Sequence, residues 1–192
     1  MTRFAEKFVS YLEKRNVIGE KDRDIYVYGA ENALYTFIST LGLLLVGLLL
    51  KRLPETAILI LLFYTNQSIG GGFHAKTHMG CFVTMIIGLL AYLAMLQLPY
   101  NQLVCIVIFC CAFAVLMALP LILHPNKKYL AAKSAVFAKR SRLIVLLQAV
   151  IFIAIVYLDL DFWIHCFSFS LGICALSRVV AVIIDRLKKQ VC

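Results

Sequence analysis

The sequence predicts an all-α integral membrane protein with about six transmembrane helices and an N-terminal amphipathic helix at the membrane interface. Its 192 residues are 62% hydrophobic and 15% charged, which is too apolar for a water-soluble domain. The apolar residues form long unbroken runs, whereas a membrane β-barrel needs alternating polar and apolar residues. The first 24 residues are charged over their whole length, so we expect no cleavable signal peptide there.

The first element is expected over residues 4–18, where large apolar side chains recur at helical spacing and charged residues lie mostly on other faces. Such a helix lies in the plane of a membrane surface, with its apolar face toward the lipid. We therefore assign residues 1–29 to a cytoplasmic amphipathic segment. The apolar residues are Phe4, Phe8, Tyr11 and Leu12, and the charged ones are Glu6, Lys7, Glu13 and Lys14.

Six apolar runs follow, each close to the roughly 17 to 25 residues that a helix needs to cross the hydrocarbon core. Three prolines, Pro54, Pro99 and Pro125, fall in the gaps between the runs, where helix breakers are expected. Because no internal repeat is visible, we treat residues 1–192 as a single membrane domain. The six spans cover residues 33–50, 56–73, 79–98, 103–123, 143–158 and 162–184.

The basic residues predict the orientation of these spans. With the N-terminus in the cytoplasm, sixteen of the nineteen Lys and Arg residues fall on the cytoplasmic side, six of them in residues 124–142. Only Lys51 and Arg52 fall in the outer loops, and Arg178 lies inside the last span. Lys and Arg are concentrated in cytoplasmic loops, so both termini should be cytoplasmic. The positive charge then faces the anionic lipids of the inner leaflet, and no nucleic-acid partner is needed to explain it.

The stretch GGGFHAKTHMGC, residues 70–81, places two histidines, a lysine and a cysteine at the cytoplasmic ends of the second and third spans. His74 and Cys81 are seven residues apart, a rise of about 10.5 Å on a continuous helix and too far for a hydrogen bond. A Cys–His pair therefore requires a break in the helix, which the glycines at 70–72 and Gly80 permit. If Cys81 opens the third span, the positive end of that helix also favours the thiolate.

A Cys–His pair of this kind is suited to peptide cleavage through a thioester. The imidazole can take the thiol proton and later protonate the leaving amine. Asn66 and Gln67, at the polar end of the second span, can supply hydrogen-bond donors to the oxyanion. An unbroken helix over residues 72–98 would instead leave the pairing to a homodimer, with the histidine of one copy beside the cysteine of the other.

Two other interpretations of the cluster stay open. A polar loop of this composition can merely cap two helices. Alternatively, His74, His78 and Cys81 have the spacing of metal ligands. However, Ala75 stands where an HExxH metallopeptidase carries its catalytic Glu, and we expect neither a metal nor a cofactor.

Three polar residues permit a different class of function. Arg178, Gln97 and Gln148 would contribute to a path across the bilayer if the protein were a non-enzymatic small transporter or channel. More simply, the glutamines hydrogen-bond between helices, and Arg178 reaches the nearby cytoplasmic interface with its guanidinium. A transporter should place its polar groups along one path between helices, whereas an enzyme should gather them at one membrane face.

The stretch GGGFHAKTHMGC resembles the glycine–histidine–cysteine signature of the accessory gene regulator protein B (AgrB) family, the membrane endopeptidases of Gram-positive quorum sensing. The length, the amphipathic N-terminal segment, the six spans and the basic segment that begins HPNKK at His124 are also similar. The resemblance therefore covers nearly the whole chain. It implies that Cys81 is the nucleophile, that His74 is its histidine, and that the protein lies in a bacterial cell membrane.

The resemblance also implies a substrate and a reaction. Cys81 would attack a small AgrD-like propeptide at the C-terminal side of its future ring, and the C-terminal tail would leave. An internal Cys or Ser of the propeptide would then displace Cys81 and close a thiolactone or lactone ring, giving the precursor of an autoinducing peptide. Exclusion of water favours cyclisation over hydrolysis. The implied partners are the propeptide and membrane lipids.

This chain departs from the family upstream of the glycines, where members often carry an arginine. Here Asn66 and Gln67 occupy that region, and no basic residue is present. We keep both as candidates for substrate binding and oxyanion stabilisation. The other candidates for these roles are Gly71, Gly72 and Lys76.

Overall fold

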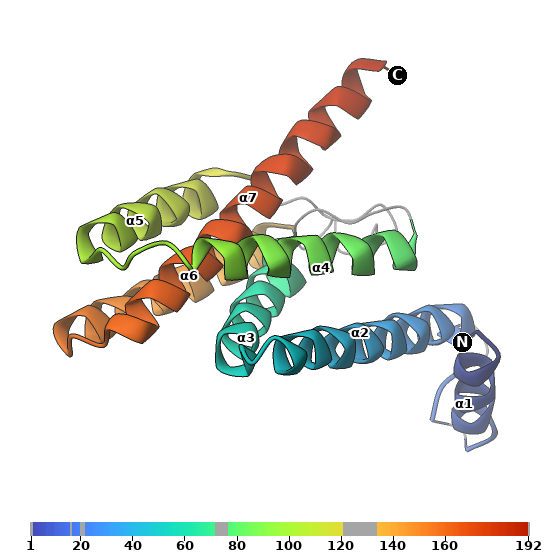
Figure 1. The fold of residues 1–192 in the computed structure, drawn as a ribbon. Coiled ribbons are helices and arrows are strands. Elements are labelled where there is room, and N and C mark those ends of the chain that lie inside the picture. The colour runs from blue at the N-terminus through green and yellow to red at the C-terminus, as the bar shows by residue number, and fades with distance from the viewer. Residues whose placement is uncertain (1, 16, 20–21, 72–76, 121–133, 192) are drawn as a thin grey trace. The chain divides into compact units, whose positions relative to one another are not determined.

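The computed structural model describes residues 2–15, 17–19, 22–71, 77–120 and 134–191. These residues form seven α-helices and no β-strand, which confirms the predicted all-α class (Figure 1). The chain divides into two compact units, Met1–Val46 and Gly47–Cys192. The helices are α1 (Thr2–Lys14), α2 (Arg23–Leu49), α3 (Leu53–Gly70), α4 (His78–Met95), α5 (Gln102–Ala118), α6 (Ser134–Tyr157) and α7 (Asp161–Val191).

Helix α1 of the first unit is amphipathic, as the sequence predicts. The small residues Ala5 and Val9 are buried one turn apart, whereas Phe4, Phe8 and Tyr11 are all more than half exposed. The large apolar side chains therefore do not form the core of this unit. They form an outward apolar strip, which is what a helix needs in order to bind a membrane surface.

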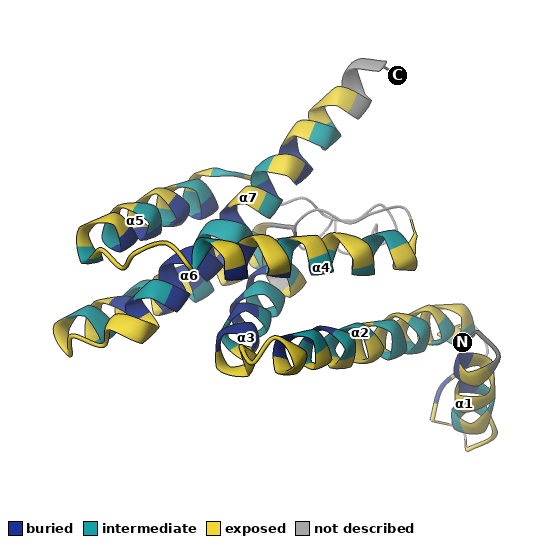
Figure 2. Ribbon diagram, in the orientation of Figure 1, coloured by how far each residue is buried: buried dark blue, intermediate teal, exposed yellow. Residues whose placement is uncertain are grey.

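Within the described residues, three helices are long and apolar enough to cross a membrane: α2, α6 from Ala135 onward, and α7 as far as Leu187. Only 11% of the most apolar stretch of α2 is buried, against 56% for α7, so α2 presents most of its apolar surface outward (Figure 2). Helices α2 and α6 begin at Arg23 and Ser134, well before the predicted spans. Apolar runs mark the part of a helix suited to lipid, but a helix can continue into charged sequence.

Helix α7 is the centre of the second unit, where it contacts α3, α4, α5 and α6 (Figures 1 and 2). Rings from α5, α6 and α7 pack together. The Phe109 and Phe152 rings are stacked with centroids 3.8 Å apart, and the ring of Phe167 on α7 lies tilted at 6.0 Å from Phe152. Small buried side chains on several faces of α7 let neighbouring helices approach closely. These residues are Cys166, Ser168, Ser170, Cys174 and Ala175.

The helices of the second unit alternate in direction, as contacts at the two ends of the unit show. Tyr100, between α4 and α5, lies 5.7 Å from His165 in the first turns of α7, measured between ring centroids. Toward the opposite end, Arg178, just beyond the middle of α7, contacts Leu116 near the end of α5 and Ser141 about two turns after the start of α6. The ends of α5 and α7 and the start of α6 therefore lie on the same side of the unit.

Candidate functional site at the α3–α4 connection

Helix α3 ends within the run of glycines. Gly71 has φ 67° and ψ 169°, and its N–H donates to the carbonyl oxygen of Gln67 at 3.1 Å. A positive φ combined with this ψ is accessible essentially only to glycine. The predicted break in the helix is therefore confirmed at its first residue, and Gly71 is required for the backbone geometry there.

Helix α4 begins just before Cys81. Thr77 is extended, with φ −121° and ψ 150°, and its Oγ1 accepts a hydrogen bond from the Gly80 N–H at 3.1 Å. The Cys81 N–H donates to the Thr77 carbonyl at 3.0 Å, which is the first hydrogen bond of the helix. Cys81 thus lies in the first turn of α4, is partly exposed and is not part of a disulfide. Side chains in a helix lean toward its N-terminus, so the thiol leans toward the connection.

His74, the other member of the predicted pair, lies outside the described residues. So do Gly72, Lys76 and the side chain of His78. The extended Thr77 nevertheless rules out one straight helix over residues 72–98. That arrangement would have held the backbones of His74 and Cys81 about 10 Å apart.

Asn66, one turn before the end of α3, is buried and bonded to another helix. Its Nδ2 donates to the Leu62 carbonyl at 2.8 Å and to Gln148 Oε1 on α6 at 3.2 Å. Both amide hydrogens are engaged, so Asn66 is poorly placed to donate to an oxyanion. Its Oδ1 has no hydrogen-bond partner in the described part of the chain. The contact also confirms the predicted interhelical bond of Gln148, whereas Gln97 is exposed in the turn after α4.

One contact between α3 and α4 shows which residues lie near Cys81. The Tyr64 hydroxyl lies 4.0 Å from Met85 Sδ. Met85 is one turn after Cys81, and Gln67 is about one turn after Tyr64, so Cys81 and Gln67 both lie on the side of this contact that faces the connection. Gln67 is partly exposed, which makes it the better oxyanion candidate of the two amide residues. Sequence reasoning missed Tyr64, because nothing in its spacing marks the contact.

Arg178 is not at an interface, which differs from the simpler prediction for it. The residue is 2% exposed, and its two terminal nitrogens donate to the Leu116 carbonyl at 3.0 Å and Ser141 Oγ at 3.4 Å. The guanidinium therefore bonds to protein atoms on α5 and α6 instead of reaching the membrane surface. The acceptors are 62 and 37 residues away in the sequence, so only the fold reveals them.

Among the described residues, no group of three or more His, Cys, Asp or Glu side chains could hold a metal ion. This finding does not test the ligand set of His74, His78 and Cys81, because two of these side chains lie outside the described part.

Comparison with known protein families matches residues 5–179 to the family described as Accessory gene regulator B. The chain belongs to the AgrB family. The match includes α2 to α6, most of α7 and the whole α3–α4 connection, which supports a quorum-sensing role for this AgrB protein, with an AgrD propeptide as the substrate that the family implies. No curated protein and no solved structure matches the chain.

Proposed function

We propose that this AgrB protein is a membrane cysteine endopeptidase that cleaves an AgrD propeptide and promotes its cyclisation. The observation that supports this most strongly is the position of Cys81. It lies in the first turn of a capped helix, partly exposed, seven residues after a histidine and at the end of the connection that begins at Gly71. The N-terminus of α4 carries partial positive charge, which stabilises a thiolate.

The proposed reaction has two steps. His74 takes the proton of Cys81, the sulfur attacks the scissile carbonyl, and the protonated amine of the C-terminal tail leaves a thioester behind. An internal thiol or hydroxyl of the propeptide then attacks the thioester carbonyl, closes the ring and returns Cys81 as a thiol. Each step passes through an oxyanion that needs hydrogen-bond donors.

The first turn of α4 offers further hydrogen-bond donors for this oxyanion. The first N–H groups of an α-helix have no acceptor within the helix. The Gly80 N–H is used by Thr77, which leaves the backbone N–H groups of His78 and Met79 to bind the oxyanion. With Gln67 they form a candidate oxyanion site close to Cys81.

We further propose that the protein is multi-pass, with both termini and the α3–α4 connection on the cytoplasmic side. Helix alternation in the second unit supports this. Tyr92, near the end of α4, donates to the Cys166 carbonyl near the start of α7 at 3.5 Å, so the start of α4, with Cys81, lies toward the side on which α5 ends. The basic residues at the start of α6 then lie on the same side as Cys81. A propeptide with an amphipathic leader would reach the site along the inner leaflet.

A transporter or channel receives less support. Gln148 and Arg178 are both buried and hydrogen-bonded to neighbouring helices, and Gln97 is exposed in a turn. Gln148 and Arg178 thus join neighbouring helices and Gln97 lies at the surface, which does not favour one polar path between helices.

Cleavage of a co-expressed AgrD propeptide, read by mass spectrometry, tests the proposal. Cys81→Ala should abolish release of the tail and still bind substrate. Cys81→Ser should be severely impaired, because a hydroxyl is much harder to ionise than a thiol. His74→Ala should lose activity to a similar degree, since residues that act as one unit are not additive. The controls Cys110→Ala and Cys111→Ala remove exposed thiols on α5 and should keep full activity.

Three results would contradict parts of this proposal. Full cleavage by the Cys81→Ala protein would end the cysteine-peptidase assignment. Inhibition by a chelator together with loss of activity in His78→Ala would favour the metal site. Restored cleavage on co-expression of the Cys81→Ala and His74→Ala chains would place the pair across a homodimer.

A further inference from the structure

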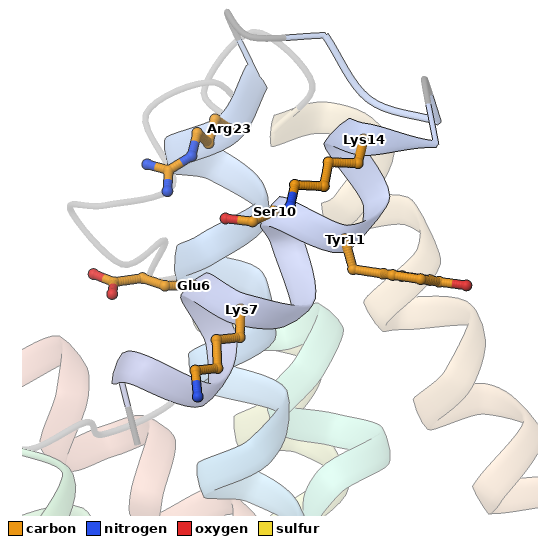
Figure 3. A pocket seen from close by; sticks show the side chains of 6 residues that line it. All are labelled: Glu6, Lys7, Ser10, Tyr11, Lys14 and Arg23. Carbon is orange, nitrogen blue, oxygen red and sulfur yellow. The ribbon is translucent and has the colours of Figure 1, made fainter.

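The first unit contains an open hollow of about 400 Å³ where α1 lies beside the start of α2 (Figure 3). Basic residues dominate its lining, with a single carboxylate among them. An open, positively charged hollow in a protein that associates with membranes is suited to an anionic group. The lining residues are Glu6, Lys7, Ser10, Tyr11, Lys14 and Arg23.

Two of the three cations in this hollow are available to a ligand. Arg23 Nε already pairs with Glu13 at 3.5 Å. Lys7 and Lys14 have no ion-pair partner among the described residues. They are two turns apart on α1, a rise of about 10.5 Å, and Figure 3 shows their side chains extending in different directions, with Ser10 between them in sequence. Two ammonium groups and a hydroxyl match the oxygens of a phosphate ester.

The position of these lysines relative to the apolar strip points to a lipid. At about 100° per residue, Phe4, Phe8 and Tyr11 fall within one narrow sector of α1, and Lys7 and Lys14 lie together in the neighbouring sector. If the aromatic side chains enter the boundary between headgroups and acyl chains, the lysines lie at the level of the lipid phosphates. A soluble phosphate would make no use of the exposed aromatic strip.

We propose that this hollow binds the headgroup of an anionic phospholipid, with Lys7, Lys14 and Ser10 around the headgroup and the strip of Phe4, Phe8 and Tyr11 against the acyl chains. The site is separate from Cys81 and does not depend on the proposed cleavage. It would anchor α1 to the anionic leaflet. Glu6 at the edge of the hollow can accept a hydrogen bond from a headgroup hydroxyl, as phosphatidylglycerol provides.

Native mass spectrometry of the full-length protein in neutral detergent, titrated with phosphatidylglycerol against phosphatidylcholine, tests this site. Wild type should prefer phosphatidylglycerol. Lys7→Gln/Lys14→Gln should weaken its binding about fivefold per cation, or about 25-fold in all. Lys7→Arg/Lys14→Arg should bind close to wild type, because the charge is kept. The matched control Lys139→Gln/Arg140→Gln removes two exposed charges from α6 and should bind close to wild type.

Four outcomes would overturn the proposal. One is equal binding of the two lipids by wild type, and another is an equal loss in the α6 control, which would indicate general charge attraction. Displacement of the lipid by inorganic phosphate at the same concentration would indicate a site for free phosphate. Unchanged lipid binding with lost propeptide binding in the Lys7→Gln/Lys14→Gln protein would assign the hollow to the peptide. Circular dichroism of each variant confirms that the helices are intact.

Discussion

Thr77 determines where α4 begins and therefore where Cys81 lies in its first turn. The hydroxyl caps the Gly80 N–H, and the carbonyl accepts from Cys81 itself. Loss of the cap would let the first turn fray. Fraying would displace both the Cys81 thiol and the backbone N–H groups proposed to bind the oxyanion. Thr77 is thus a positioning residue for the proposed nucleophile, although it makes no contact with the reacting atoms in the mechanism.

Thr77→Ala should reduce the rate of propeptide cleavage by more than its effect on stability explains. Removal of an N-cap hydroxyl typically costs about 1 kcal/mol, and misplacement of a reacting group by about 1 Å can cost a factor of about 100 in rate. Asn101→Ala is the matched control, because Asn101 caps α5 through the same kind of bond to Val104 N–H at 3.2 Å. Rates and melting temperatures of both variants should be compared.

Thr77→Ser keeps the capping hydroxyl and should restore the rate. An equal loss of activity in Thr77→Ala and Asn101→Ala would show that the effect of Thr77 is purely structural.

At the scale of elements, two buried polar contacts hold the helices around α7. Asn66 on α3 bonds to Gln148 on α6, and Arg178 on α7 bonds to α5 and to Ser141 on α6. Ser141 and Gln148 are seven residues apart, and both are at most 5% exposed, so they lie on the same buried face of α6. This face is polar toward the start of the helix and apolar at Phe152, one turn beyond Gln148.

The bond between Asn66 and Gln148 should appear as a coupling in a double-mutant cycle. Asn66→Leu and Gln148→Leu each leave a buried amide without its partner, whereas the double variant leaves neither. We expect the double variant to be more stable than the sum of the single effects by about 0.5–1.5 kcal/mol, measured by thermal unfolding in detergent. Gln97→Leu, at an exposed position, is the control and should change stability little.

The cycle also separates two roles of Asn66. If the double variant recovers stability and cleaves the propeptide normally, Asn66 serves only to join α3 to α6. If it recovers stability without activity, Asn66 takes part in substrate binding through its free Oδ1. Additive single effects would show that the bond contributes nothing to folding.

For the whole molecule, local sequence signals predicted helices and breaks well, and distant contacts poorly. The apolar runs predicted the helical class, and the glycines at 70–72 predicted the α3–α4 break, because these features depend on neighbours in the chain. Pro54, expected between two helices, lies in the first turn of α3, where proline is tolerated. The partners of Arg178 and Gln148 lie 37 to 82 residues away. Hydrophobic periodicity carries no information on such distant pairs. The prediction that Arg178 reaches the interface was therefore wrong. The starts of α2 and α6 were also placed too late, because hydropathy measures compatibility with lipid and charged residues can still be helical.

The two ends of α6 offer a direct test of the proposed membrane topology. Lys139 and Tyr157 are both exposed, near opposite ends of one continuous helix that is long enough to cross a membrane. Because most basic residues fall on the cytoplasmic side of the six-span arrangement, Lys139 should face the cytoplasm and Tyr157 the outside. Tyr157→Cys should react with a membrane-impermeant maleimide on intact cells, whereas Lys139→Cys should react only after permeabilisation. Cys110 and Cys111 are replaced by Ser in both proteins, since their exposed thiols would obscure the result. Labelling of Lys139→Cys from outside intact cells would reverse the orientation and move the α3–α4 connection, with Cys81, to the outer face.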